Sequence, residues 1–397
     1  MEIKLDPIID FGKMPIANAF CTPDQFAQEF FYDLVLGFDP KTKAIGLVNS
    51  PPLEKLFHDH YAFYSSTSKG MQIHFAQTAR KLLPIAKKGL VVELGSNDGI
   101  MLEAWKNLGI PAIGVEPSKN VADVSIAAGH DVITKFLSNK VVDEILDRGK
   151  VSLVYSANTF CQFANLSEYL GYVIRLIGKN GVFVFEDPYF LDIFKKTSYD
   201  QIYDEHVWYF TISFINNMLD PFGYHVFDCE HLEVHGGELR MFVGAKDSFQ
   251  AKPNVKLWLS KEINLSKKIE TLSKNIKKSK VALLEILNRI KQEGKTICGF
   301  GATSKATTIF NYCGIGPDLI PSVTDNTPIK IGKFYPGVHI PVVSQEAFEA
   351  GKNDPKRRID YVFLGAWNHF KEINKYQSWY TKSGGHWLTH VPIPKII

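Results

Sequence analysis

The sequence predicts an α/β protein in which a small β-rich module precedes two Rossmann-like domains. Strand-like and helical patterns alternate from residue 69 to residue 186, which is typical of βαβ units and a parallel sheet. A second strand, glycine-rich turn and helix begin at residue 296. Residues before 69 show only short strand-like runs, which predict the separate module. We expect the three parts to span residues 1–68, 69–250 and 251–397.

Length and composition exclude several classes of protein. The 397 residues exceed one ordinary core, and 45 basic against 42 acidic side chains leave a net charge of only +3, so nothing indicates a nucleic-acid partner. No apolar run reaches about 18 residues and the N-terminus lacks a secretory pattern, so we expect a cytoplasmic protein without a membrane partner. Five scattered cysteines form no C-x-x-C pair and predict neither disulfides nor a zinc ribbon: Cys21, Cys161, Cys229, Cys298 and Cys313.

The N-terminal module is expected to hold short strands over residues 32–38 and 44–48, joined by the turn-forming residues 39–43. It ends in an aromatic and hydroxyl-rich connection at residues 59–68. Such a segment either lies over a ligand or is a plain linker whose rings pack on the next domain, and composition alone does not decide between the two.

The central part begins with helical apolar spacing over residues 69–88. The alternation that follows predicts five parallel strands, and a helix at 166–177 that ends at Gly-Lys-Asn-Gly precedes the last of them. The strands are expected at 90–94, 112–115, 131–133, 153–156 and 181–186. Residues 223–228 and 232–243 are expected to extend this sheet with antiparallel strands.

The glycine-bearing turn after the first of these strands is a candidate ligand site, because open α/β sheets bind ligands at the carboxyl ends of their strands. Its pattern, Glu93-x-Gly95-x-Asn97-x-Gly99, differs in spacing from the dinucleotide motif G-x-G-x-x-G, and Glu116 ends the next strand. Two strands that end in glycine and then in a carboxylate suit an adenosyl group that carries a ribose diol and a cation. The pattern therefore predicts S-adenosylmethionine and not NAD.

The last part of the chain starts with apolar positions at helical spacing among many lysines, over residues 245–293. This pattern predicts one long amphipathic helix or a broken pair. Residues 296–305 then run from a strand through a glycine-rich turn into a helix, a geometry in which backbone N–H groups hold a phosphate. Further strands ending in polar residues, at 322–326 and 360–368, complete a second, smaller Rossmann-like domain.

Motifs in one order along the whole chain point to a family. They are Asp10-x-Gly-x-x-Pro-Ile-Ala-Asn-x-Phe20, the Tyr-x-x-Tyr-Ser-Ser-x-Ser segment 61–68, Glu93-x-Gly-Ser-Asn-Asp-Gly99, Val115-Glu-Pro117, Tyr199-Asp-x-Ile-Tyr-x-Glu-His206, His235-Gly-Gly-x-Leu-Arg240, Gly299-x-Gly-Ala-x-x-Lys305, Asn311-Tyr-Cys-Gly-Ile-Gly316 and Pro336-Gly-x-His-Ile-Pro341. This order resembles the sugar C-methyltransferases that add a branching methyl group to C-3 of nucleotide-activated 4-keto deoxysugars, as in the mycarose, noviose and tetronitrose pathways. The resemblance implies a class I S-adenosylmethionine methyltransferase domain and a nucleotide-diphosphate sugar as substrate.

In that family a base removes the acidic C-3 proton and the enolate carbon attacks the sulfonium methyl group. By the resemblance, His206 is the base, Tyr203 lies beside the sugar, and Glu205 orients the histidine or binds a hydroxyl. Taken by residue type alone, His206 could equally be a satisfied core histidine. His235 is expected to border the pocket, although close backbone packing explains the two glycines after it equally well.

The resemblance also assigns binding residues. Glu116 is expected to accept from the ribose hydroxyls, the glycines of the loop to allow close approach, and Phe136 to stack near the adenine. The expected cofactor residues are Tyr64, Ser66, Glu93, Gly95, Asn97, Asp98, Gly99, Glu116, Phe136 and Asn158. The expected substrate residues, which would hold the diphosphate or nucleoside, are His235, Gly299, Gly301, Ser304, Lys305 and Asn368.

One departure from the family concerns zinc. The N-terminal module of the family holds zinc through two C-x-x-C pairs, but here the first pair is absent and Thr42 and Ile45 occupy the second. Neither side chain ligates zinc. We therefore expect a metal-free module that is held together by Phe11, Phe20 and Phe38.

A second departure lies after the fourth strand, where the family has an Asn-x-x-x-His pattern. Here the pattern runs from Asn158 to Gln162, so glutamine replaces an active-site histidine. Glutamine donates to an oxygen but does not titrate near neutrality.

The sequence thus predicts an S-adenosylmethionine-dependent C-methyltransferase that acts on a nucleotide-linked keto-deoxysugar, with His206 as base, in a monomer or homodimer. Gln162 leaves open methylation of oxygen or nitrogen on a related nucleotide sugar. The missing zinc ligands leave open a binding protein without catalysis, although the intact loop from Glu93 to Gly99 argues against it.

Overall fold

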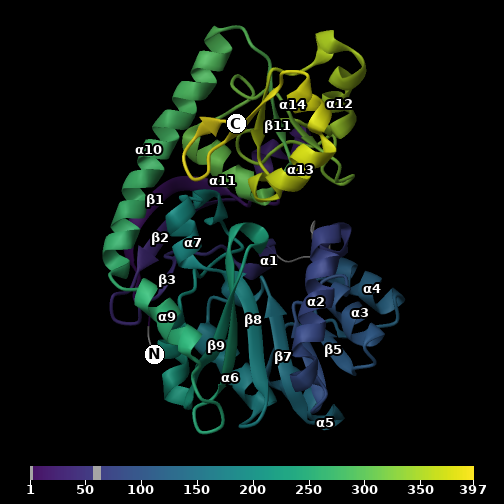
Figure 1. The fold of residues 1–397 in the computed structure, drawn as a ribbon, viewed down its shortest axis with the longest axis vertical. Coiled ribbons are helices and arrows are strands. Elements are labelled where there is room, and N and C mark those ends of the chain that lie inside the picture. The colour runs from purple at the N-terminus through teal and green to yellow at the C-terminus, as the bar shows by residue number, and fades with distance from the viewer. Residues whose placement is uncertain (1–2, 57–63) are drawn as a thin grey trace.

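Three β-sheets joined by helices make up the structure (Figure 1). The computed structural model describes residues 3–56 and 64–397, and the strands of these residues form sheets of three, seven and six strands. The seven-stranded sheet and its helices form the lower half of Figure 1, the six-stranded sheet forms the upper half, and the N-terminal sheet lies between them. We call these parts the central domain, the C-terminal domain and the N-terminal module. Of the predicted connection at 59–68, residues 59–63 lie outside the described residues.

The N-terminal sheet is antiparallel and buries its apolar face against helices from much later in the chain. Phe11, Phe20 and Phe38 are buried in one cluster with apolar side chains of helices α10 (Leu265–Gln292) and α11 (Ser304–Cys313). The module therefore shares its core with the C-terminal domain. Its elements are β1 (Asp6–Pro15), the 3₁₀ helix η1 (Pro23–Gln28), β2 (Phe31–Phe38), β3 (Ile45–Leu47) and α1 (Leu53–Leu56).

Thr42 and Ile45, at the positions of the second cysteine pair of the zinc-binding family, have structural roles. Thr42 Oγ1 donates to Asp39 Oδ2 at 2.7 Å and closes the turn after β2, while Ile45 is buried in the core. Within residues 3–56 and 64–397, no three His, Cys, Asp or Glu side chains are grouped so that they could hold a metal ion.

The central sheet has the order β6-β5-β4-β7-β8-β10-β9, in which the first five strands are parallel and β10 runs antiparallel to both of its neighbours. This is the arrangement of the predicted class I methyltransferase fold, and it confirms both the parallel strands and the antiparallel extension. The strands are β4 (Leu90–Leu94), β5 (Ala112–Val115), β6 (Asp131–Ile133), β7 (Val151–Ala157), β8 (Val182–Pro188), β9 (Tyr224–Leu232) and β10 (Glu238–Ala245).

Helices cover both faces of the central sheet because its strands are apolar on both sides. Helices α2 and α3 pack on one face, and α5, α6 and α8 pack on the other. The helices are α2 (Lys69–Ala86), α3 (Ile100–Asn107), α4 (Lys119–Ala127), α5 (Asn139–Arg148), α6 (Leu166–Ile177), α7 (Phe190–Lys196) and α8 (Ile212–Leu219).

The lysine-rich stretch is a broken pair of helices, α9 (Pro253–Lys261) and α10 (Leu265–Gln292), interrupted at Asn264, whose φ is +60°. Helix α10 buries one apolar face and runs along the side of the molecule from the central to the C-terminal domain (Figure 1).

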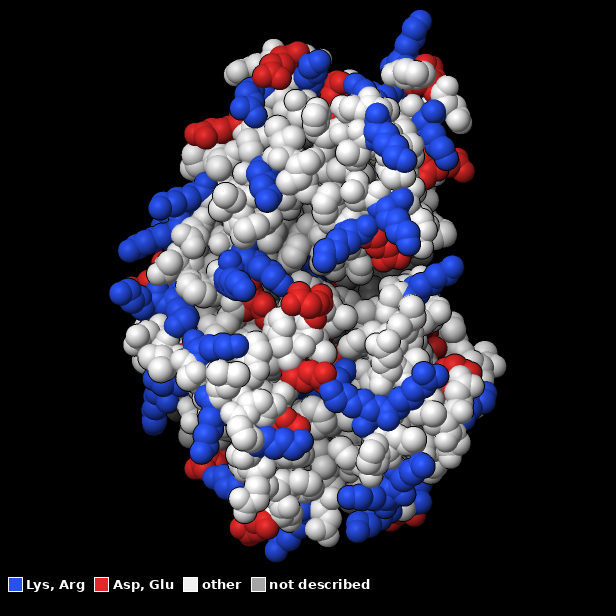
Figure 2. All heavy atoms as spheres, viewed as in Figure 1, with Lys and Arg blue, Asp and Glu red and all other residues white. Residues whose placement is uncertain are grey.

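On the face of the molecule that Figure 2 shows, Lys and Arg side chains are dispersed over both halves and are interleaved with Asp and Glu. None of the helices in the described residues is long and apolar enough to cross a membrane.

The C-terminal sheet has the order β13-β12-β11-β14-β15-β16 and is parallel except for its last strand. The predicted strand, turn and helix at residue 296 form its centre. The strands are β11 (Ile297–Phe300), β12 (Val323–Asp325), β13 (Val342–Ser344), β14 (Tyr361–Leu364), β15 (His386–Thr389) and β16 (Lys395–Ile396). The helices are α11 (Ser304–Cys313), α12 (Gln345–Asn353), α13 (Phe370–Tyr376) and α14 (Ser378–Lys382).

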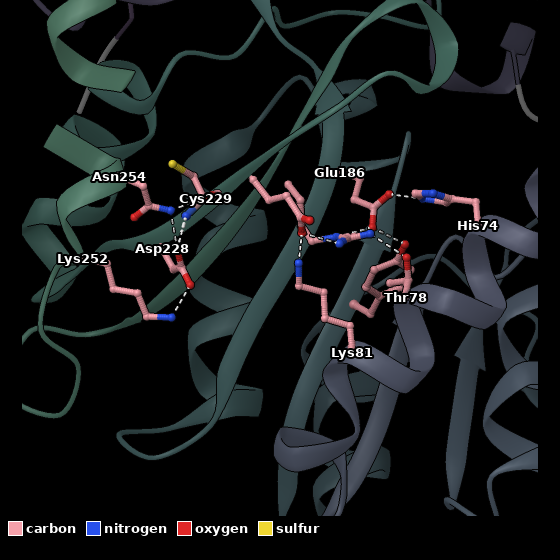
Figure 3. Close-up of polar contacts among 11 residues, drawn as sticks. His74, Thr78, Lys81, Glu186, Asp228, Cys229, Lys252 and Asn254 are labelled. Atoms are coloured by element: carbon pink, nitrogen blue, oxygen red, sulfur yellow. Dashed lines mark hydrogen bonds and ion pairs between the residues drawn. The ribbon is translucent and has the colours of Figure 1, made fainter. Parts of the chain in front are cut away.

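A buried ion-pair network fastens α2 to the central sheet (Figure 3). Arg240 Nε of β10 donates to Glu186 Oε1 of β8 at 2.7 Å, and His74 Nε2 of α2 lies 2.6 Å from Glu186 Oε2. Arg240 also donates to Thr78 Oγ1 of α2 and to Glu230 Oε2 of β9. Burial raises the pKa of Glu186, but the His74 hydrogen bond and the Arg240 charge outweigh it, so the pKa lies below its usual range. Glu186 is therefore an ionised carboxylate that is only 1% exposed.

Candidate active site

A cavity of about 550 Å³ lies where the three parts of the chain meet. One wall is formed by the carboxyl ends of β4, β5 and β7, and the opposite wall by the turn before α11. Asn18 of the N-terminal module and the segment from Tyr203 to His206 close the space between these walls. Groups from all three parts of the chain therefore face one cavity.

Glu116 occupies the end of β5 and is held by backbone donors. Its Oε2 accepts from the N–H of Asn97 at 3.0 Å, and its Oε1 accepts from the N–H of Ser118 at 2.8 Å. Burial raises the pKa of this carboxyl, while the two backbone hydrogen bonds lower it, and the net pKa is above its usual range. Each carboxylate oxygen accepts more than one hydrogen bond, so the side chain is oriented and can still receive a diol.

The segment from Tyr64 to Ser66 is tied to the loop after β4. The N–H of Ser65 donates to Asn97 Oδ1 at 3.0 Å, and the N–H of Ser66 donates to the Asp98 carboxylate at 3.0 and 3.2 Å. Tyr64 lines the cavity from this segment, whereas Ser66 and Asp98 do not. Ser66 and Asp98 thus hold the segment against the loop.

The two glycines of the loop differ in what requires them. Gly95 lines the cavity with φ +75°, and a Cβ there would lie 2.2 Å from Thr159 Oγ1. Gly99 lies away from the cavity with φ +87°, and a Cβ there would lie 2.3 Å from Ser125 Oγ of α4. Gly99 therefore serves helix packing, while Gly95 keeps the cavity wall open.

Glu93 lies behind this loop and does not line the cavity. It is 3% exposed, and no described residue donates to its Oε2. Burial, with the neighbouring carboxylates Glu116 and Asp98, raises the pKa of Glu93 well above its usual range. The open wall at Gly95 and the oriented Glu116 fit a ligand that carries a ribose diol, as S-adenosylmethionine does.

Tyr203 and His206 form a buried pair beside the cavity. His206 Nδ1 lies 3.2 Å from the carbonyl oxygen of Gln201, which can only accept, so Nδ1 carries the proton and Nε2 has the lone pair. Tyr203 Oη donates to this Nε2 at 3.1 Å. Burial, followed by the charge of Lys305, lowers the pKa of His206 to about 3. The histidine is therefore neutral at physiological pH.

Gln162 lies in the 3₁₀ helix η3 (Phe160–Gln162) and lines the same cavity. Its Nε2 donates to the carbonyl oxygen of Asn158 at 2.8 Å. Asn158 has φ +51° and also lines the cavity. The glutamine thus takes a fixed position at the carboxyl end of β7.

The C-terminal wall carries two lysines, Lys305 in the first turn of α11 and Lys330 in the loop after β12. Lys305 Nζ donates to the carbonyl oxygen of His235 at 2.8 Å, and Lys330 Nζ donates to that of Ala302 at 2.8 Å. Burial lowers the pKa of Lys305, while the charges of Asp200 and Glu238 oppose this shift. Within the described residues, neither lysine has a carboxylate within 4 Å. This wall can therefore receive an anion.

Most of the sequence-predicted residues line this cavity: His206, Tyr203, Glu205, Gln162, Tyr64, Gly95, Asn97, Glu116, Phe136, Asn158, His235, Ser304, Lys305 and Asn368. The others lie behind its surface: Ser66, Glu93, Asp98, Gly99, Gly299 and Gly301. Gly299 is an interior position of β11, where a Cβ would lie 2.7 Å from Val323 Cγ2. Gly301 has φ +86°, and a Cβ there would lie 2.8 Å from Ala366 Cβ.

Sequence reasoning assigned no role to several other lining residues, among them Asn18, Lys330 and Asp325. Asp325 ends β12 much as Glu116 ends β5, so the strand pattern carried a signal for it. Asn18 belongs to the first motif of the family resemblance. Lys330 gave no signal, because one lysine in a loop resembles any other.

Comparisons with known proteins agree with this architecture. Residues 69–228 match a family model described as a methyltransferase domain, and residues 233–392 match one described as a C-methyltransferase C-terminal domain. The chain is 28% identical to the C-methyltransferase NovU of Streptomyces niveus over 404 residues, which cover 98% of this chain and 94% of that protein.

Two solved structures show weaker likeness. Magnesium protoporphyrin IX methyltransferase from Synechocystis is 10% identical with a TM-score of 0.33, covering 44% of this chain and 80% of its own. The CcbJ methyltransferase of Streptomyces caelestis is 13% identical with a TM-score of 0.34, covering 43% and 89%. Such low scores add nothing to the fold assignment, which rests on the order of the central sheet. The strand order of the central sheet and the two successive matches, to a methyltransferase domain and to a C-methyltransferase C-terminal domain, thus identify an S-adenosylmethionine-dependent methyltransferase.

Proposed function

We propose that the protein transfers a methyl group to C-3 of a nucleotide-linked 4-keto-deoxysugar, through an enolate formed by His206. The observation that carries this proposal is that a buried imidazole with a free-base Nε2 shares one cavity with a strand-end carboxylate on one wall and two lysines on the other. The homologue over 98% of the chain is a C-methyltransferase, which supports transfer to carbon.

The chemistry follows from these groups. A ketone at C-4 acidifies the proton on the neighbouring carbon, and Nε2 of His206 takes that proton as the C–H electron pair forms the enolate. S-adenosylmethionine supplies an electrophilic methyl group to the enolate carbon. Tyr203 Oη, which donates to Nε2 in this structure, gives up that position to the substrate and lies beside the developing enolate oxygen.

Lys305 couples substrate binding to the strength of the base. In this structure its charge helps to lower the pKa of His206. A diphosphate held against Lys305 offsets that charge, so the pKa of His206 rises towards its usual range when the substrate is bound. The base is thereby strengthened by the substrate on which it acts.

Removal of the Glu116 carboxylate should abolish the stabilisation that the cofactor gives. We expect S-adenosylmethionine at about 100 times its Kd to stabilise the wild-type protein by about 2.7 kcal/mol, read as a rise in Tm. Glu116→Ala should show no rise at the same concentration, whereas Glu144→Ala, an exposed carboxylate on α5, should match the wild type. Equal rises in Glu116→Ala and the wild type would remove Glu116 from the cofactor site.

Loss of the Lys305 ammonium should weaken the binding of the sugar nucleotide. We expect Lys305→Ala to raise the KM for the sugar nucleotide by about tenfold or more, because charged hydrogen bonds contribute about 1.5–3 kcal/mol. The KM for S-adenosylmethionine should stay within about twofold, since the cofactor wall is not touched. Lys291→Ala, an exposed lysine paired with Asp318, is the matched control. An unchanged KM in Lys305→Ala would contradict the diphosphate assignment.

Gln162 favours one other candidate function, methylation of an oxygen or nitrogen on a related nucleotide sugar. Its amide holds a fixed position in the cavity and does not titrate near neutrality. A hydroxyl or amino acceptor needs no enolate, so this reaction depends less on a second titrating group.

A panel of sugar nucleotides tests the proposal. The enzyme and S-adenosylmethionine are incubated with dTDP-, UDP- and GDP-linked 4-keto-6-deoxyhexoses, and mass spectrometry and NMR locate any added methyl group. A methyl on C-3, with solvent deuterium entering C-3 in the absence of cofactor, supports the proposal. A methyl group on C-5, the other carbon beside the ketone, would change the position of methylation on the sugar but keep the enolate chemistry. A methyl on oxygen or nitrogen would select the second candidate, and no transfer to any acceptor would overturn both.

A further inference from the structure

The N-terminal module reaches the cavity through the segment that follows β1. The N–H of Ala17 donates to both carboxylate oxygens of Asp204, at 3.1 and 3.2 Å, and its carbonyl oxygen accepts from Thr307 Oγ1 of α11 at 2.9 Å. Ala17 is therefore held by the central and the C-terminal domains at once. The next residue, Asn18, lines the cavity at their junction.

Asn18 is bonded to a carboxylate next to the proposed base. Its Nδ2 donates to Glu205 Oε1 at 2.6 Å. Glu205 is only 6% exposed and lies between Asp204, which anchors Ala17, and His206. Contacts from the module thus hold the side chains of both Asp204 and Glu205.

An amide next to a carboxylate is suited to binding a hydroxyl group, because a hydroxyl both donates and accepts. The bond to Glu205 uses one of the two hydrogens on Asn18 Nδ2. The second Nδ2 hydrogen and the side-chain oxygen Oδ1 are engaged by no other residue that the structure describes. Both side chains line the same cavity as His206.

We propose that Asn18 is a substrate-positioning residue that, together with Glu205, binds a hydroxyl of the acceptor sugar on or next to the reacting carbon. This rests on the proposed function, since it requires a sugar acceptor in the cavity. The hydroxyl donates to Glu205 and accepts from the amide of Asn18. The N-terminal module is then part of the acceptor site, a role that does not depend on a metal ion.

Kinetics of Asn18 variants test this assignment. The acceptor is whichever of the dTDP-, UDP- or GDP-linked 4-keto-6-deoxyhexoses gains a methyl group from the wild type. We expect Asn18→Ala to raise the KM for this acceptor by about tenfold, to leave the KM for S-adenosylmethionine within about twofold, and to keep Tm near that of the wild type. Lys13→Ala is the matched control, because Lys13 lies on the same module in an exposed pair with Asp33.

A charge swap separates positioning from a purely structural role. Asn18→Asp places a second carboxylate against Glu205 and should raise the acceptor KM more than Asn18→Ala does. The double variant Asn18→Asp/Glu205→Gln restores an amide-to-carboxylate bond in the opposite direction, and we expect it to recover part of the acceptor KM.

The inference is overturned if Asn18→Ala changes the acceptor KM no more than Lys13→Ala does. It is also overturned if both KM values and Tm change together, because that pattern indicates a structural role alone. A wild-type enzyme that methylates no sugar nucleotide would instead overturn the proposed function, and that result is visible before any variant is made.

Discussion

Replacement of His206 by alanine should lower kcat for methyl transfer by about 10²–10⁴-fold, the range that a positioned general base supplies. The reason is geometric, since the proposed mechanism uses Nε2 of His206 to accept the proton, and the Gln201 carbonyl, bonded to Nδ1, leaves Nε2 unprotonated and facing Tyr203 Oη. Solvent deuterium should no longer enter the sugar beside the ketone. Binding of S-adenosylmethionine should persist, because Glu116 and its loop are untouched.

Two further measurements check the role of His206. Tyr203→Phe removes the hydroxyl but leaves the imidazole, so it should retain measurable deuterium exchange. A His206→Ala variant that exchanges deuterium at the wild-type rate would remove this residue from the role of base.

The dependence of the reaction on pH is the other measurement. With the pKa lowered to about 3, His206 is protonated only at very low pH, so kcat/KM should show no inflection from it between pH 5 and pH 8.

Loss of the Arg240 guanidinium should destabilise the protein by about 3–5 kcal/mol, measured as the free energy of unfolding in urea. Arg240→Met keeps most of the apolar volume but leaves the carboxylate of Glu186 buried and without its guanidinium (Figure 3). Helix α2 also loses its bond from Arg240 to Thr78. Because α2 carries Met71 and Phe75 into the cavity wall, cofactor binding should weaken as well.

Lys81→Ala is the matched control for this prediction. Lys81 pairs with Glu230, as Arg240 does, but it is exposed, so its loss should cost less than about 1 kcal/mol. The double variant Arg240→Met/Glu186→Gln removes the buried charge and should recover part of the lost stability. If Arg240→Met costs no more than Lys81→Ala, the network does not hold α2 to the sheet.

The pKa of Glu186 adds a pH dependence to the same network. Its pKa in the folded protein lies below the usual value, so the unfolded chain binds more protons as the pH falls. The stability from this group is fully present above the pKa of an unfolded glutamate, about 4.3, and is lost as the pH falls below it. The Arg240→Met variant should show a weaker acid dependence, because the His74 hydrogen bond still lowers the pKa of Glu186.

The elements of the central and C-terminal domains could be predicted because local pattern and burial agree there. The strand at 90–94 and the helix at 166–177 match the structure, and the antiparallel pair before residue 250 is present, although its second strand begins at Glu238 and not at residue 232. The apolar spacing of the lysine-rich stretch does not distinguish one helix from two, since it continues across the break. The break depends on Asn264, whose left-handed backbone conformation no periodicity reveals.

The candidate site was predictable where its residues follow strand ends. Glu116 and Asn158 lie at the carboxyl ends of parallel strands, and those ends meet at one edge of a sheet whatever the helices between them do. Gly99, Gly299 and Gly301 fit the same motifs but serve packing, because a glycine needed for close helix or strand contact looks in sequence like one that faces a ligand.

What the sequence determined by itself is the succession of elements, the glycine-bearing loop from Glu93 to Gly99 and the glycine-rich turn before α11, because these depend on neighbours in the chain. Only the tertiary structure decided that the N-terminal module shares its core with α10 and α11 and carries Asn18 to Glu205, 187 positions along the chain. Contacts of that separation depend on how the apolar faces of whole domains are buried against each other, and no local pattern records which face meets which.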